Sequence, residues 1–295
     1  MRRGSLIGLG IVCSVVLLAL PDAAKGQAVR RAVRVENDVV FGKGGATELK
    51  LDLAMPKDGE GPFPAIVCIH GGGWIKGDRK QLQKSIEALA GRGYVAISPD
   101  YRLAPRDRFP AQIEDCKAAV RWLRANAEQY HIDTRRIGGV GFSAGAHLAC
   151  LLGVTGKDDG LEGDGGNAEK SSAVQAVVSF FGPTDLTQPG WDKDVQTQNL
   201  VPLLGGTAAE KADAYRKASP MTYAGKNAPP FLFLHGTEDR IVPIKQSQDL
   251  ADKLRKAGVS ARVVAVEGEG HGWRGEKLLA TISQMMDFFD ETLKK

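Results

Sequence analysis

Histidine and cysteine are scarce in this chain, which has five and four of them among its 295 residues. No two histidines stand at a spacing typical of metal ligands, so we expect no metal site. Beyond the N-terminal segment, Cys68, Cys116 and Cys150 lie in apolar stretches and could form one disulfide at most. We interpret them as buried free thiols without a nucleophilic role.

A strong charge of either sign is also missing. The 39 basic and 35 acidic residues leave a formal net charge of only +4. Proteins that bind nucleic acid or an anionic membrane surface depend on a concentrated basic patch, and this composition indicates none. No internal repeat is visible, which excludes solenoid and propeller architectures.

Long apolar runs are confined to the N-terminus. Arg2 and Arg3 precede an apolar stretch from Leu6 to Leu20, and Gly26-Gln27-Ala28 supplies the small residues that a signal peptidase reads. Residues 1–28 are therefore predicted to be a signal peptide, with a retained N-terminal anchor as the alternative. We expect a secreted or periplasmic protein without stable membrane insertion after cleavage, and a single domain over residues 29–295.

Strand-like and helix-like segments alternate along this domain. A hairpin is predicted over 31–41 and 48–55, followed by strands at 64–69, 94–98, 136–140, 174–181, 231–235 and 261–266. Helices are predicted between them at 79–91, 110–130, 144–152, 244–257 and 278–293, and Asp78 is the predicted N-cap of the first. This alternation is typical of an α/β fold with a mostly parallel sheet covered by helices on both faces. Residues 156–172, rich in glycine and acidic residues, are predicted to form a solvated loop rather than a calcium site.

The most informative stretch is Gly141-Phe142-Ser143-Ala144-Gly145, which joins a predicted strand to a predicted helix. A serine on so sharp a turn is exposed at the end of the sheet, and the two glycines let strand and helix approach closely. Free amides at the start of the following helix lie beside the hydroxyl. Ser143 is therefore the candidate nucleophile.

A second motif, His70-Gly71-Gly72-Gly73-Trp74, directly follows the apolar strand at 64–69. Ester hydrolysis passes through a tetrahedral oxyanion, and backbone amides on a glycine loop can approach it closely enough to stabilise it. We assign the amides of Gly72, Gly73 and Ala144 to this oxyanion hole.

A base and an acid follow two later strands. His271 stands in Gly270-His271-Gly272, and Asp239 follows His235-Gly236, so the chain order is serine, acid, histidine. The imidazole would take the serine proton and return it to the leaving group, while the carboxylate orients the imidazole.

Other titratable residues compete for these roles. Glu238 neighbours Asp239 but points the opposite way on an extended turn, and Glu267 and Glu269 suit local ion pairs near His271. The histidines His70 and His235 are expected to hydrogen-bond loops beside the site, whereas His147 lies on the helix after Ser143 and His131 ends a helix.

Together with Asp100-Tyr101-Arg102-Leu103-Ala104-Pro105 and Ser219-Pro220, these motifs resemble the α/β-hydrolase superfamily. Within it, residues 34–292 resemble the esterase/lipase group that includes bacterial acetyl xylan and feruloyl esterases, and more loosely the hormone-sensitive-lipase group. The resemblance implies an eight-stranded sheet and a cleft covered by residues 182–228. Phe142 stands where hormone-sensitive-lipase relatives carry aspartate, and the short segment before the His-Gly-Gly-Gly loop indicates no large N-terminal cap.

These observations predict an exported serine carboxylesterase that needs no cofactor and acts on small acyl esters, of acetyl or feruloyl type, on a carbohydrate or small molecule. Four aromatic residues could line its pocket or simply pack in the core: Trp74, Phe142, Trp191 and Trp273. Two alternatives remain: a peptidase or arylformamidase-type amidase using the same triad, and a non-catalytic binding domain on a hydrolase fold. Loss of the triad would mark the last, and all three residues are present.

Overall fold

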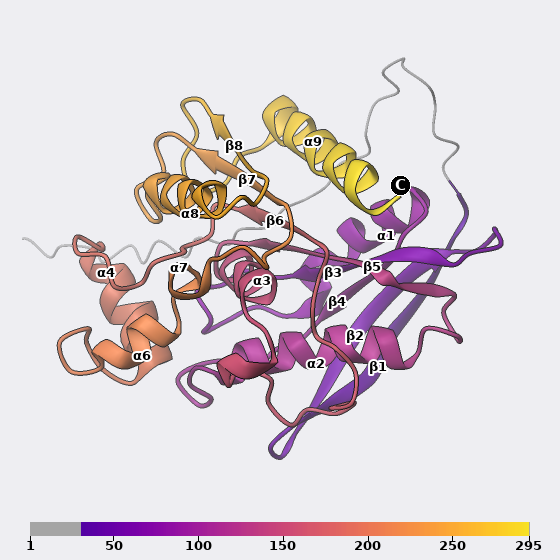
Figure 1. Ribbon diagram of the computed structural model, residues 1–295, viewed down its shortest axis with the longest axis horizontal. Helices are drawn as coiled ribbons and strands as arrows, with labels where there is room; N and C mark the ends of the chain where they lie inside the picture. The colour runs from indigo at the N-terminus through magenta and orange to yellow at the C-terminus, as the bar shows by residue number, and fades with distance from the viewer. Residues whose placement is uncertain (1–30, 295) are drawn as a thin grey trace, which may run out of the picture.

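The computed structural model of the protein describes residues 31–294, so the predicted signal peptide, residues 1–28, lies outside the described residues. An eight-stranded sheet runs through the molecule in the order β1-β2-β4-β3-β5-β6-β7-β8 (Figure 1). The first two strands form an antiparallel hairpin, β2 pairs antiparallel with β4, and all other pairs are parallel. The strands are β1 (Val33–Gly44), β2 (Thr47–Pro56), β3 (Phe63–Ile69), β4 (Val95–Pro99), β5 (Ile132–Phe142), β6 (Ala176–Phe180), β7 (Phe231–Gly236) and β8 (Ala261–Val266).

Helices cover both faces of this sheet, as predicted. The helices α2, α3 and α8 lie on one face of the sheet, and α1 and α9 lie on the other (Figure 1). The side chains of the two groups of helices pack in two separate core clusters. The major helices are α1 (Gln83–Gly91), α2 (Ala111–Ala125), α3 (Ala144–Val154), α8 (Lys245–Lys256) and α9 (Gly275–Leu293). Short helices occupy the insertion between β6 and β7: α4 (Lys193–Val195), α5 (Val201–Leu204), α6 (Ala212–Lys217) and α7 (Pro220–Tyr223).

Burial follows the position of each element. Every residue of β3, a central parallel strand, is buried, whereas the edge strand β1 is largely exposed along its length. The predicted helix cap is present, since the Asp78 carboxylate accepts from the Lys80 amide at the start of a 3₁₀ turn that leads into α1. Before β3, the described residues form only the β1–β2 hairpin, so no large N-terminal cap is present there.

The helix α2 is shorter than the sequence predicts, because it ends at Ala125 instead of near residue 130. The chain then turns back, and the Ile132 amide donates to the Ala127 carbonyl over 2.8 Å at the start of β5. His131 adopts a positive φ of 52° in this turn rather than ending the helix. The tight turn into β5 therefore ends the helix before its apolar pattern ends.

Most residues of the predicted loop at 156–172 are exposed, but the loop is also anchored to the core. Leu161 is fully buried there, and the Glu162 carboxylate pairs with Lys117 over 2.6 Å and with Arg121 over 2.9 Å. Both cations belong to α2 and are almost completely buried. Because a buried cation needs a counter-charge, they hold this loop against the helix.

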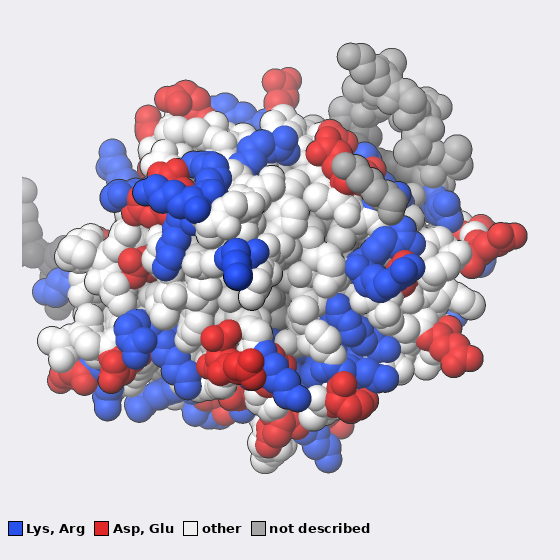
Figure 2. Space-filling view, viewed as in Figure 1, with Lys and Arg blue, Asp and Glu red and all other residues white. Residues whose placement is uncertain are grey.

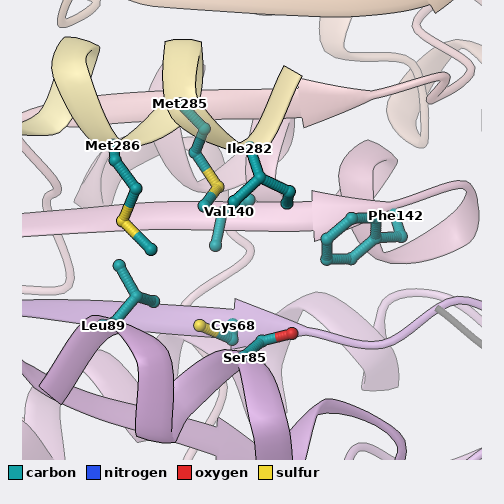
Figure 3. Close-up of a pocket in the computed structure, with 8 residues that line it drawn as sticks. All are labelled: Cys68, Ser85, Leu89, Val140, Phe142, Ile282, Met285 and Met286. Carbon is teal, nitrogen blue, oxygen red and sulfur yellow. The ribbon is translucent and has the colours of Figure 1, made fainter. Parts of the chain in front are cut away.

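A small apolar cavity lies in the core between α1, α9 and the sheet, with Phe142, Cys68 and Met285 among the side chains around it (Figure 3). On the surface, basic and acidic side chains are interspersed over the face shown in Figure 2 rather than gathered by sign. Cys68, Cys116 and Cys150 are free and buried, as predicted. From residue 31 to residue 294, no helix combines the length and apolarity that crossing a membrane requires.

Candidate active site

Ser143 lies at the turn between β5 and α3, with a backbone φ of 54° and ψ of −118°. Such a conformation is strained for a residue with a side chain and marks functional sites. The flanking glycines make the turn possible: a Cβ on Gly141 would lie 2.1 Å from the Gly145 carbonyl oxygen, and one on Gly145 would lie 2.2 Å from the Ile69 carbonyl oxygen. The turn thus presents the hydroxyl beside the start of the helix.

The structure brings Ser143, His271 and Asp239 together from the ends of three different strands. The Ser143 hydroxyl donates to Nε2 of His271 over 2.8 Å, and Nδ1 of the same ring donates to Oδ2 of Asp239 over 2.7 Å. This is the geometry that a serine–histidine–acid relay requires, with both bonds inside the normal hydrogen-bonding range. The arrangement can activate the hydroxyl as a nucleophile.

The Asp239 carboxylate is almost fully buried but well satisfied. Its Oδ1 accepts from the amides of Ile241 and Val242 at 2.9 Å each, and its Oδ2 lies 3.3 Å from Nε2 of His235. Burial alone would raise the pKa of Asp239, but hydrogen bonds from His235, His271 and the Val242 amide outweigh it and lower the pKa to about 2. The group is therefore an anion at neutral pH, as a partner for an imidazolium must be.

The competing acids are placed elsewhere. Glu238 is exposed. Glu269 forms an ion pair with Lys277 over 2.9 Å, and the Glu267 carbonyl accepts from the same ammonium. Among the candidates considered, only Asp239 reaches the imidazole of His271.

The His-Gly-Gly-Gly-Trp loop follows β3 and packs against the turn that bears Ser143. Gly72 and Gly73 have φ values of 119° and 61°, which favour glycine. Within residues 31–294, the amides of Gly72, Gly73 and Ala144 donate to no other group. They are available to an oxyanion beside Ser143.

Neighbouring side chains hold this loop in place. The Tyr101 hydroxyl donates to the His70 carbonyl over 3.0 Å, and the two rings stack with centroids 4.2 Å apart. Asn199, from the insertion, lies against Gly73, where an added Cβ would come 2.1 Å from its Nδ2. The contact of Asn199 was not predicted from the sequence, because no local pattern links positions 73 and 199.

Three of the four aromatic residues considered for the pocket are in packed surroundings. Trp74, Phe142 and Trp273 are each at most 7 % exposed. Phe142 stacks on Phe180, and the Trp273 indole donates to Thr281 over 2.9 Å. Trp191 alone is partly exposed, and it lines a surface hollow.

The contacts of two residues near the site were not predicted from the sequence. Phe181, at the end of β6 with a φ of 44°, places its ring edge-on to His271 with centroids 4.8 Å apart. His147 joins Trp74 to the carbonyl of Ala218 in the insertion. Both relationships depend on side-chain direction, which the linear pattern does not show.

Metal ligands are not gathered anywhere in the described part of the chain, where no three histidine, cysteine or carboxylate side chains are grouped so that they could hold an ion. The site therefore consists of a hydroxyl, an imidazole, a carboxylate and free backbone amides. Such a set can carry out nucleophilic acyl transfer.

Comparisons with known proteins point to esterases. Esterase LipC of Mycobacterium tuberculosis is 32 % identical over 72 % of this chain and 53 % of its own length, so the chain spans about half the length of the curated relatives it matches. A truncated carbohydrate esterase from gut microbiota superposes with a TM-score of 0.77 at 29 % identity, over 91 % of this chain and 99 % of that one. Esterase 2 of Thermogutta terrifontis gives a TM-score of 0.73 at 30 % identity, over 89 % and 92 % of the two chains.

A family model agrees with these relatives and covers more than half of the chain. The model described as BD-FAE matches residues 51–254, which begin within β2 and end within α8. The chain therefore belongs to the BD-FAE family of esterase-related α/β hydrolases.

Proposed function

We propose that this protein is an exported serine carboxylesterase that hydrolyses small acyl esters, of acetyl or feruloyl type, on carbohydrates. One observation carries the proposal: the continuous hydrogen-bonded chain from Ser143 through His271 to Asp239, next to three free amides. A structural serine has no need of a strained turn, an oriented imidazole and an anionic partner together.

In the proposed reaction, Oγ of Ser143 attacks the acyl carbon while its proton passes to Nε2 of His271. The negative charge that forms on the carbonyl oxygen is stabilised by the amides of Gly72, Gly73 and Ala144. The imidazolium is stabilised by Asp239, whose lowered pKa keeps it ionised. The same proton then passes to the departing alcohol oxygen as the ester C–O bond breaks, which leaves an acyl-serine.

The second half of the reaction repeats these steps with water. Nε2 of His271 takes a proton from water as the oxygen attacks the acyl carbon, and the tetrahedral oxyanion occupies the same amides. The proton returns to Oγ of Ser143, and the carboxylic acid leaves. Every group in this scheme belongs to the chain, so no cofactor enters it.

The substrate part of the proposal has separate support. The relative from gut microbiota is a carbohydrate esterase, and esterase 2 of T. terrifontis has structures with propionate and with butyrate bound. These relatives favour a short acyl group and a sugar alcohol for this chain. Export is supported by the signal-like pattern of residues 1–28.

The test is turnover of p-nitrophenyl acetate and acetylated xylan by the purified protein and its Ser143→Ala variant. We expect the substitution to reduce kcat by about 10⁴-fold or more, with an unchanged circular dichroism spectrum. Esterase 2 of T. terrifontis is phosphonylated by sarin, so a fluorophosphonate probe should label the wild type and not the variant. Ester turnover that survives in Ser143→Ala would contradict the mechanism, and cleavage of proline peptides or formylkynurenine in place of esters would favour the amidase alternative.

A further inference from the structure

A surface hollow lies beside the predicted catalytic acid. Its lining comes from two segments, residues 188–192 of the insertion and residues between 240 and 246 that follow β7. The second segment begins immediately after Asp239, and the amide of Ile241, in the wall, donates to Oδ1 of that carboxylate. The wall of the hollow is thus attached directly to the triad.

Hydrogen bonds hold the two segments together. Nε2 of Gln246 donates to Oε1 of Gln188 over 2.9 Å, and Nε2 of Gln188 donates in turn to Asp249 over 2.9 Å. Within the insertion, the side-chain Nε2 of Gln196 donates to the backbone carbonyl of Trp191 over 2.6 Å. The walls are therefore organised before any ligand binds, which lowers the entropic cost of binding.

Two side chains of the hollow have unused hydrogen-bonding capacity. The Nε1–H of Trp191 is buried and has no acceptor within residues 31–294, although buried indole N–H groups usually have one. The Arg240 side chain is exposed and takes part in no ion pair or hydrogen bond with another residue of that range. The hollow thus combines an aromatic side chain with an exposed guanidinium that has no partner in the described residues.

This combination suits a sugar ring. The C–H bonds on one face of a pyranose pack against an indole, while its hydroxyl and ring oxygens accept hydrogen bonds. A hydrocarbon chain would offer no acceptor to the Arg240 guanidinium and would displace water from it, which costs free energy. We propose that the Trp191–Arg240 hollow binds a pyranose unit in the alcohol part of the ester, an inference that rests on the proposed esterase function.

The distance from the nucleophile is compatible with this assignment. Ser143 follows β5 and the hollow adjoins the end of β7, and only β6 separates these two strands. At the usual spacing between strands, β5 and β7 are about 10 Å apart. Both Ser143 and the hollow therefore lie at the ends of nearby parallel strands, at the same edge of the sheet.

The experiment is a titration of the Ser143→Ala variant with xylotriose, in which calorimetry measures binding. This measurement requires no turnover. We expect saturable binding that becomes about tenfold weaker when Trp191→Ala is added, and severalfold weaker with Arg240→Gln. Tyr223→Ala truncates another half-buried aromatic side chain of the same insertion and serves as the control. It should bind xylotriose as Ser143→Ala does.

Kinetics of the active enzyme provide a second measurement. Trp191→Ala should lower the ratio of kcat/KM for acetylated xylotriose to kcat/KM for p-nitrophenyl acetate by about tenfold. Equal losses on both substrates, absence of xylotriose binding, or binding that survives Trp191→Ala would each overturn the sugar subsite. Absence of any ester turnover by the wild type would contradict the proposed function instead, and the titration would still decide whether the hollow binds a sugar.

Discussion

His147 accepts a hydrogen bond from Trp74, whose Nε1 lies 3.2 Å from Nδ1 of the imidazole, and the two ring planes are 85° apart. The other ring nitrogen, Nε2, donates to the carbonyl of Ala218 over 2.7 Å. Trp74 ends the predicted oxyanion loop, and His147 lies one helical turn beyond Ser143. A single neutral imidazole therefore joins the loop, the helix α3 and the insertion between β6 and β7.

Replacing His147 with leucine should destabilise the protein strongly. The substitution leaves the buried Nε1–H of Trp74 and the carbonyl of Ala218 unpaired, at a cost of about 1–3 kcal/mol for each group. We expect the free energy of unfolding, measured by denaturant titration, to fall by about 2–5 kcal/mol. His147→Gln offers both an acceptor and a donor and should recover part of the loss. Equal losses in the two variants would show that ring packing matters and the hydrogen bonds do not.

Stability should also decline in mild acid because of the same imidazole. Burial lowers the pKa of His147 from 6.5 to about 4, against the opposing effect of the hydrogen bond to Ala218. As the pH falls, the unfolded chain takes up this proton first, so the stabilisation is complete above about pH 6.5 and is lost progressively toward pH 4, by about 3 kcal/mol. The difference in free energy of unfolding between wild type and His147→Gln should shrink over this range. A difference that stays constant from pH 7 to pH 4 would contradict the assignment.

The close packing around the turn that bears Ser143 predicts that alanine substitutions at Gly145 and Gly139 affect activity differently. A Cβ on Gly145 would lie 2.2 Å from the Ile69 carbonyl oxygen and 2.4 Å from that of His70, so Gly145→Ala must push the turn that bears Ser143 away from the predicted oxyanion loop. On β5, a Cβ on Gly139 would meet only Leu152, at 3.9 Å. We expect kcat to fall about 100-fold or more in Gly145→Ala and to change little in Gly139→Ala. Similar activities in the two variants would rule out this account of the turn.

The loop at residues 156–172, which Glu162 anchors to α2, provides a test of the fold. Glu162→Gln would leave the fully buried Lys117 ammonium without its counter-charge, a change that typically costs about 3–5 kcal/mol. Glu169→Gln, at an exposed position of the same loop, is the control and should leave the free energy of unfolding unchanged.

The contribution of Glu162 should depend on pH. Burial by itself would raise the pKa of Glu162, but hydrogen bonds from Lys117 and Ser172 and the charges of Lys117 and Arg121 lower it below 4.5. Its stabilisation is therefore present above pH 4.5 and is lost as the pH falls through the lowered pKa. Free energies of unfolding, measured by denaturant titration, should converge for wild type and Glu162→Gln at low pH. A difference between the two proteins that stays constant with pH would contradict the ion pair.

Much of the fold was accessible from local pattern. The eight strands, the helices on both faces and the Asp78 cap follow from periodicity and from turn residues, which act over a few positions. The anchoring of the 156–172 loop was not accessible, because the partners of Glu162 are Lys117 and Arg121, which lie on a helix more than 40 positions earlier in the chain. The burial of Phe142 and Trp273 was not accessible either. Aromatic side chains are typical of pockets, but these two lie in the core.

By itself, the sequence determined which chemical groups stand at the ends of which strands: a serine between glycines, an acid after β7 and a histidine after β8. Only the tertiary structure decided that these groups lie within hydrogen-bonding distance, and that Trp191 alone of the four aromatic candidates lines the surface hollow. The physical reason is that a strand or a sharp turn is specified by neighbouring residues. Which side chains meet depends on strand order and burial, and these emerge only when the whole sheet is assembled.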